Sequence, residues 1–143
     1  MIPLKVHNVI DYVVGVVLLV CPYLFGFSGV AAAKDLFLFA GATLIVYSLL
    51  TNYYYAVARV IPLGVHMVLD CLVGVLAILG PSIFGYRDMI TGGQYAIHWI
   101  MGVAALGLVA LTSTRTEAAK TPEERREIAH ELTTGTPTQT FTH

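Results

Sequence analysis

A histidine and an aspartate stand four residues apart at two places in the chain, as His7/Asp11 and His66/Asp70. This i, i+4 spacing places both side chains of a pair on one face of an α-helix. Each pair is embedded in an apolar run, where ionisable groups are costly and mark paired or functional positions. Three chemistries suit them: hydrogen bonds that hold helices together, a proton or ion relay, and ligation of a metal ion or a b-type haem through His7 and His66. The residues alone leave the three open.

The segments that carry these pairs are strongly apolar. The chain has 143 residues, of which 57% are hydrophobic and 12% are charged, and its mean hydropathy is +0.75. Because a soluble domain carries about 25% charged residues, this composition predicts an integral membrane protein with the lipid bilayer as its surroundings. The formal net charge of −1 gives no basic surface, so we expect no nucleic-acid partner.

Four apolar stretches, at about 4–22, 35–51, 62–80 and 94–112, approach the roughly 20 residues that cross a bilayer as a helix. The connections between them are short, which is typical of antiparallel neighbouring helices. A soluble bundle of buried helices is the alternative, but it needs polar outer faces that these stretches lack. We therefore predict an all-α membrane protein with four transmembrane helices.

The second half of the chain repeats the first. Residues 2–27 align without gaps to residues 61–86 at an offset of 59, and 13 of the 26 aligned positions are identical. The later segments match more weakly, with Gly41 opposite Gly102 and Leu50-Thr51 opposite Leu111-Thr112. We predict two tandem two-helix hairpins, 1–60 and 61–112, related by a pseudo-two-fold axis along the membrane normal. This symmetry would place both His-Asp pairs at equal depth, near the inner ends of their helices.

Small residues extend the polar face of each repeat. Gly15 and Gly74 follow the aspartates by one helical turn, and a small residue there lets another helix approach closely. Gly41 and Gly102 occupy matching places in the second helix of each hairpin. We expect these four glycines to be helix-packing positions, and the polar pairs to face the bundle interior.

A motif of proline, aromatic and glycine residues ends the first helix of each repeat. It reads Cys21-Pro22-Tyr23-Leu24-Phe25-Gly26-Phe27 in the first copy and Gly80-Pro81-Ser82-Ile83-Phe84-Gly85-Tyr86 in the second. Proline is expected to end each helix near the outer interface, and glycine to let the chain reverse. The predicted helix-end signature is Pro22, Tyr23, Phe25, Gly26, Pro81, Phe84 and Gly85.

With its His-x-x-x-Asp lead-in, this motif resembles the SPW-repeat family of small integral membrane proteins, over about residues 1–112. That family is defined by a Ser-Pro-Trp motif in the first of two transmembrane helices. Neither copy here keeps the serine or the tryptophan, and Tyr23 stands in the place of the tryptophan. The resemblance implies a bacterial or archaeal membrane protein, and it brings no established activity.

Basic residues predict the orientation in the membrane. Six of them fall on the side of the N-terminus, the second connection and the tail, against two on the other side. The first set is Lys5, Arg59, Arg115, Lys120, Arg125 and Arg126, and the second is Lys34 and Arg87. This bias predicts a multi-pass membrane protein with both termini in the cytoplasm. With the bacterial or archaeal origin that the resemblance implies, we expect it in the plasma membrane of a prokaryote. Tyr23, Phe25, Phe27, Tyr86, Tyr95 and Trp99 would then form an aromatic belt at the outer interface.

His98 stands apart from the two pairs. It lies near the outer end of the fourth helix, whereas His66 lies near the inner end of the third, so the two are too far apart to share a ligand sphere. We expect an interfacial or helix-end hydrogen bond for it. The tail, 113–143, is predicted to form a short cytosolic helix at about 122–132 followed by a disordered end.

The chain contains no nucleophile triad, phosphate loop or dinucleotide fingerprint. We therefore expect a non-enzymatic structural or accessory protein that acts as a homo-oligomer or within a larger membrane complex, and no cofactor. A haem- or metal-binding redox component, or a proton- or ion-conducting protein, is the alternative that uses the same His and Asp residues.

Overall fold

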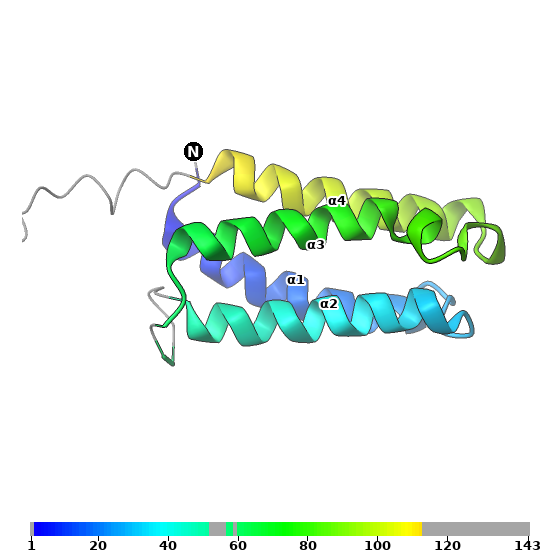
Figure 1. The fold of residues 1–143 in the computed structure, drawn as a ribbon, viewed down its shortest axis with the longest axis horizontal. Coiled ribbons are helices and arrows are strands. Elements are labelled where there is room, and N and C mark those ends of the chain that lie inside the picture. Colours follow the sequence, from blue (N-terminus) through cyan, green and yellow to red (C-terminus); the bar gives the residue numbers. More distant parts are fainter. Residues whose placement is uncertain (1, 52–56, 59, 113–143) are drawn as a thin grey trace, which may run out of the picture. The chain divides into compact units, whose positions relative to one another are not determined.

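The computed structural model describes residues 2–51, 57, 58 and 60–112. It contains the helices α1 (Leu4–Leu24), α2 (Ala31–Leu50), α3 (Leu63–Ile83) and α4 (Gly92–Leu111), with a short 3-10 helix η1 (Arg87–Met89) before α4 (Figure 1). All four α-helices are long and apolar enough to cross a membrane. The predicted all-α membrane fold with four spanning helices is confirmed. The predicted tail helix lies outside the described residues.

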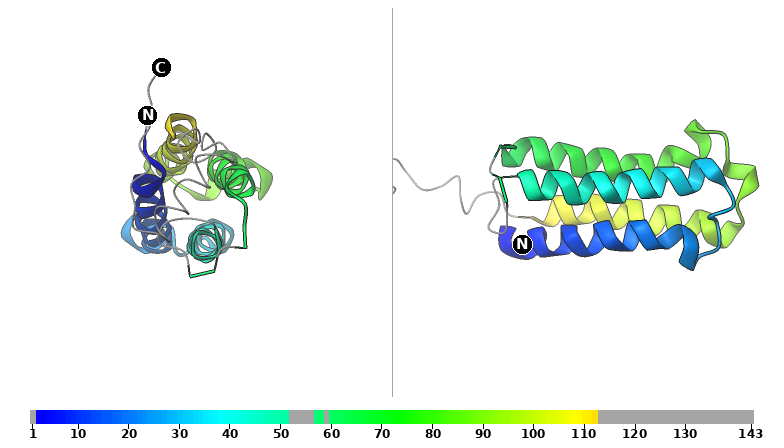
Figure 2. Two further views of the ribbon diagram at one scale, coloured as in Figure 1. Left: turned by 90° about the vertical axis from the view of Figure 1, so that its left-hand side faces the viewer. Right: turned by 90° about the horizontal axis from the view of Figure 1, so that it is seen from below.

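The four helices stand in chain order around a central axis when the bundle is seen end-on (Figure 2). Consequently α1 and α3 lie on one diagonal, and α2 and α4 on the other. Helix α1 packs chiefly on α2, and α3 chiefly on α4. The start of each hairpin is joined to the end of the other, because Ile2 N–H donates to Leu111 O over 2.8 Å and Ile61 N–H donates to Leu50 O over 2.9 Å.

Glycines set the distance between the two helices of each hairpin. A Cβ atom built on Gly41 would lie 2.7 Å from the carbonyl oxygen of Gly15, and one on Gly102 would lie 2.6 Å from that of Gly74. Side chains larger than hydrogen are therefore excluded at these contacts. Since lipid gives no hydrophobic drive for helices to associate, such close backbone contact is a main source of packing energy in a bilayer.

The prolines do not end the first helix of each repeat, as the sequence had suggested. Helix α1 continues through Pro22 to Leu24, and α3 continues through Pro81 to Ile83. A proline removes a single backbone donor, and the helical bonding resumes directly after it, with Phe25 N–H donating to Cys21 O over 2.9 Å. The loss of one bond near the helix end is too small to stop the helix there.

Glycine in a left-handed conformation is what reverses the chain. Gly26 and Gly85 have φ angles of 71° and 67°. Phe27 N–H then donates to Pro22 O over 2.9 Å, and the equivalent bond of the second repeat measures 3.0 Å. This is the hydrogen bond that closes a Schellman motif, in which glycine is favoured because it has no Cβ.

The same turn directs the next aromatic ring inward. Phe27 and Tyr86 are each only 1% exposed and belong to the core, together with Phe37. Their predicted place in an outer aromatic belt is therefore wrong. Tyr23 and Trp99, in contrast, are 60% and 45% exposed.

The glycine contacts predict a contrast between two alanine substitutions in α4. Gly102→Ala drives a Cβ against Gly74 O and to 2.4 Å from Ile78 Cγ1, whereas nothing lies within 4 Å of a Cβ on Gly107. We expect Gly102→Ala to destabilise the purified protein by about 1–3 kcal/mol, as overpacking does. The control Gly107→Ala should leave the midpoint of thermal unfolding in detergent unchanged or slightly raised. Equal midpoints for the two variants would contradict this account of the hairpin contact.

Candidate functional site

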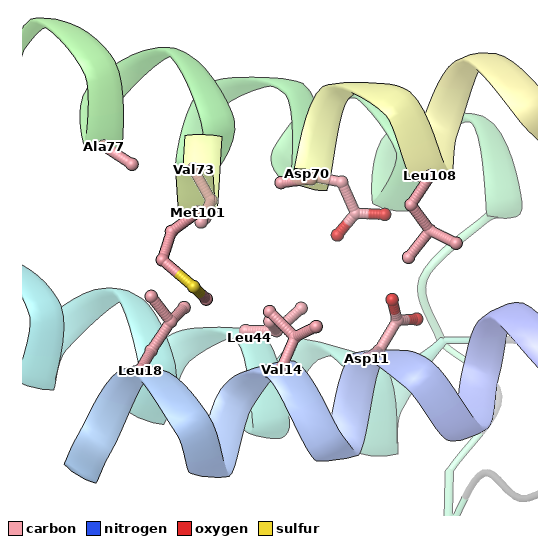
Figure 3. A pocket seen from close by; sticks show the side chains of 10 residues that line it. Asp11, Val14, Leu18, Leu44, Asp70, Val73, Ala77, Met101 and Leu108 are labelled. Carbon is pink, nitrogen blue, oxygen red and sulfur yellow. The ribbon is translucent and has the colours of Figure 1, made fainter. Parts of the chain in front are cut away.

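Four ionisable side chains from α1 and α3 converge on the bundle axis. His7, Asp11, His66 and Asp70 each present one nitrogen or oxygen atom such that the four atoms lie within 4.8 Å of one another. None of the four residues is more than 5% exposed. Figure 3 shows the two carboxylates facing each other across the gap between their helices. We refer to these four residues as the tetrad.

Each histidine of the tetrad contacts both carboxylates. His7 Nε2 lies 3.3 Å from Asp11 Oδ1 on its own helix and 3.2 Å from Asp70 Oδ2 on α3. His66 Nε2 lies 3.1 Å from Asp70 Oδ2 on its own helix and 3.2 Å from Asp11 Oδ2 on α1. The i, i+4 spacing supplies one contact of each histidine, and the diagonal placement of α1 and α3 supplies the other.

Two threonines hold the far side of the imidazole rings. His66 Nδ1 lies 2.9 Å from Thr51 Oγ1, and His7 Nδ1 lies 2.6 Å from Thr112 Oγ1. Each threonine hydroxyl donates its hydrogen to the backbone carbonyl four residues earlier, over 2.6 Å in both cases. Because a hydroxyl has one hydrogen, the threonine oxygen can only accept from the imidazole. Both Nδ1 atoms therefore carry a proton.

A proton on Nδ1 determines the hydrogen-bonding role of the other ring nitrogen, Nε2. A neutral imidazole protonated on Nδ1 presents a lone pair at Nε2. In the tetrad each Nε2 faces carboxylate oxygens at 3.1–3.3 Å, which also present lone pairs. Lone pairs at that distance repel, so a proton, carried by Nε2 or by the carboxyl group, or a cation must lie between them. Two protons or one divalent cation would satisfy both histidines.

Tyr47 of α2 completes the set of polar partners. Its hydroxyl donates to Asp70 Oδ1 over 2.6 Å, and its ring packs edge-on against His66 with centroids 4.9 Å apart. Tyr47, Thr51 and Thr112 were missed as site residues in the sequence. The repeated Leu-Thr dipeptide at 50–51 and 111–112 was the signal that pointed to the two threonines.

A small apolar cavity adjoins the carboxylates on the side away from the threonines. Its volume is about 20 Å³, which is room for one water-sized particle. Apart from Asp11 and Asp70 its lining is Val14, Leu18, Leu44, Val73, Ala77, Met101, Ala105 and Leu108 (Figure 3). The tetrad therefore borders hydrocarbon-like surroundings, in which an uncompensated charge is costly.

A sequence model of the SPW repeat domain matches residues 5–119 of the chain. The chain belongs to the SPW repeat family. Searches of curated proteins and of solved structures found no significant match. In this SPW repeat protein the tetrad lies at one end of α1 and α3, and the Pro-x-x-x-Gly turns lie at the other.

The end of the SPW repeat protein with the glycine turns holds a second buried group, around His98. His98 is fully buried in the bundle. Its Nδ1–H donates to Gln94 O over 2.8 Å, and its ring lies among those of Phe27, Phe37 and Tyr86. Within the described residues neither His98 Nε2 nor the Tyr86 hydroxyl has a hydrogen-bond partner. Burial raises the pKa of Tyr86 to about 12, which keeps its hydroxyl neutral.

Tyr86→Phe tests whether the unpartnered Tyr86 hydroxyl lowers the stability of the folded protein. The equivalent residue of the first repeat is Phe27, and the ring of Tyr86 has the same buried place. Removing an unpartnered buried hydroxyl should stabilise the protein by about 1 kcal/mol. Because the pKa of Tyr86 is about 12, the gain should be constant between about pH 6 and 9. Thermal unfolding in detergent measures it, and a loss of stability would reveal a partner for the hydroxyl.

Proposed function

We propose that this SPW repeat protein is a non-enzymatic structural or accessory membrane protein in which the tetrad joins the two hairpins. The supporting observation is the pair of crossing contacts, His7 with Asp70 and His66 with Asp11, each 3.2 Å long. They link the first hairpin to the second at full burial. Paired polar groups in a bilayer specify which helices meet, even where each contributes only about 0.6–2 kcal/mol.

The surroundings of the tetrad favour a closed joint over a conducting path. The threonine hydroxyls and the Tyr47 hydroxyl are each engaged in hydrogen bonds of 2.6 Å. The cavity next to the carboxylates is lined by aliphatic side chains and one methionine. A proton or ion relay would instead require a chain of polar groups or water that continues beyond the carboxylates.

The placement proposed for the protein is the plasma membrane of a prokaryote, with both termini in the cytoplasm. Lys5 lies at the tetrad end of the bundle, whereas Lys34 and Arg87 lie at the end with the glycine turns. In the sequence, the remaining basic residues lie between α2 and α3 or after α4, outside the described residues. The proposed role is one within a homo-oligomer or a larger membrane complex.

Asp70→Asn tests the joining role directly. The carboxamide keeps the shape of the side chain but carries no charge, so both imidazoles lose an ionic partner at 3.1–3.2 Å. We expect a loss of about 3–5 kcal/mol in stability, the range for breaking a buried ion pair. The matched control is Asp35→Asn, whose side chain is 69% exposed and pairs with Lys34. Thermal unfolding in detergent compares the two; similar midpoints would remove the basis of the proposal.

The orientation predicts where fused reporters function. A green fluorescent protein fused after residue 143 should fluoresce, because it folds in the cytoplasm. Alkaline phosphatase inserted after Gly29, in the turn between α1 and α2, should be active, because it matures outside the plasma membrane. The reverse pattern in a bacterial host would show that the charge bias had been assigned to the wrong side.

A further inference from the structure

We propose that the tetrad binds one divalent transition-metal ion of the Zn²⁺ type, through Nε2 of His7 and His66 and one carboxylate oxygen each of Asp11 and Asp70. This inference rests on the joining role proposed above and names what joins the hairpins. Three observations carry it: the charge balance of the site, its distances and the outer partners of its ligands.

Charge balance comes first. Two carboxylates and two neutral imidazoles carry a charge of −2, and they lie at most 5% exposed beside an apolar cavity. A bilayer interior does not tolerate such a charge without compensation. One divalent cation neutralises it completely and lies between the lone pairs that would otherwise repel. It also binds the four groups to a common centre instead of leaving separate pairwise contacts.

The distances suit tetrahedral coordination. Zn²⁺ binds imidazole nitrogen and carboxylate oxygen at about 2.0–2.2 Å, so neighbouring ligand atoms of a tetrahedron are about 3.3–3.6 Å apart. Three nitrogen–oxygen distances to Asp70 Oδ2 and Asp11 Oδ2 are 3.1–3.2 Å, and His7 Nε2 lies 3.3 Å from the other oxygen of Asp11. All four ligand atoms lie within 4.8 Å of one another, so closing around an ion requires the wider separations to shorten while the nitrogen–oxygen distances lengthen slightly.

The outer partners are those of a metal site. A metal-binding histidine nearly always donates its second N–H to an oxygen, which fixes the ring and the tautomer. Thr51 and Thr112 accept that hydrogen from His66 and His7, over 2.9 Å and 2.6 Å. The Tyr47 hydroxyl donates to Asp70 Oδ1 and leaves Oδ2 directed at both imidazoles. Thus both Nε2 atoms and Oδ2 are aimed at the centre by groups outside it.

The donor set indicates the class of metal. Imidazole favours Zn²⁺, Co²⁺, Ni²⁺ and Fe²⁺, whereas Ca²⁺ and Mg²⁺ require six or more oxygen ligands. Four protein ligands would fill a tetrahedron and leave no open position for water, which is the arrangement of a closed site. We therefore expect Zn²⁺ to bind more tightly than Mn²⁺ and Mg²⁺.

The test uses the full-length protein without an affinity tag, purified in detergent, freed of metal with a chelator and titrated with ZnCl₂ or CoCl₂. We expect one equivalent of Zn²⁺ per chain by elemental analysis and a rise of several degrees in the unfolding midpoint. Bound Co²⁺ should give the intense visible absorption of a tetrahedral site. Binding far below one equivalent, with no shift in the midpoint for Zn²⁺ or Co²⁺, would overturn the inference.

Three variants separate the tetrad from other binding. Thr51→Val combined with Thr112→Val removes the outer partners and should weaken Zn²⁺ binding about 10–100-fold. His98→Gln removes a buried histidine outside the tetrad, and should bind Zn²⁺ as the wild type does. So should His130→Ala combined with His143→Ala, which removes the tail histidines. Loss of the bound equivalent in either of the last two variants would place the metal elsewhere.

Metal binding and metal-free stability, measured for the wild type and for Asp70→Asn, distinguish failure of the metal inference from failure of the joining role. If wild type binds no metal but Asp70→Asn still destabilises the metal-free protein, the metal inference falls and the tetrad remains a joint held by protons. If wild type binds Zn²⁺ and Asp70→Asn abolishes binding without altering metal-free stability, the metal inference stands, and the joining role without metal falls.

Discussion

The absence of water from a bilayer interior is the constraint on which the rest of this structure depends. A carboxylate in that medium cannot replace a lost protein partner by solvent, so its partners must be supplied by other helices. In this protein each carboxylate is shared by two imidazoles, one from α1 and one from α3. The sharing is possible only because α1 and α3 occupy a diagonal of the bundle and both face its axis (Figure 2). The order of the helices around the axis is therefore tied to the polar group at its centre.

Different interactions act within the hairpins and between them. Within a hairpin, glycine pairs such as Gly15 with Gly41 bring two backbones into contact, and no polar side chain is needed there. Between hairpins, the end that holds the tetrad is joined by the tetrad itself and by Thr51 and Thr112, each of which contacts an imidazole. Thr112 belongs to the second hairpin and contacts His7 of the first. Thr51 belongs to the first hairpin and contacts His66 of the second. Both hydroxyl contacts therefore cross between hairpins, and add to the carboxylate contacts that do so.

Much of this arrangement follows from the sequence, and the reasons for the exceptions are physical. The apolar stretches and the offset of 59 residues predict four spans and two matching His-Asp pairs, because both patterns are periodic along the chain. The threonines could not be assigned a role from the sequence, because a threonine hydroxyl in a helix can donate to the carbonyl four residues earlier wherever the helix lies. Its second contact, with an imidazole, depends on how the hairpins dock. The end of α1 beyond Pro22 depends on the Schellman bond that forms after it. The burial of Phe27 likewise depends on the direction in which the Gly26 turn leaves the helix.

The two repeats differ where a difference can be compensated locally. At the end with the glycine turns, the first repeat has Cys21 and Phe27 where the second has Gly80 and Tyr86. A Cβ on Gly80 would lie 3.2 Å from the Tyr86 hydroxyl, so the smaller residue makes room for the larger ring within one turn of chain. No such local exchange is available at the tetrad, where each residue contacts the two opposite-charge partners on both α1 and α3. Changing one histidine or aspartate alters the charge balance for both repeats at once. The identity of the repeats at these four positions is what a shared centre on the bundle axis requires, whether two protons or one divalent cation occupy it.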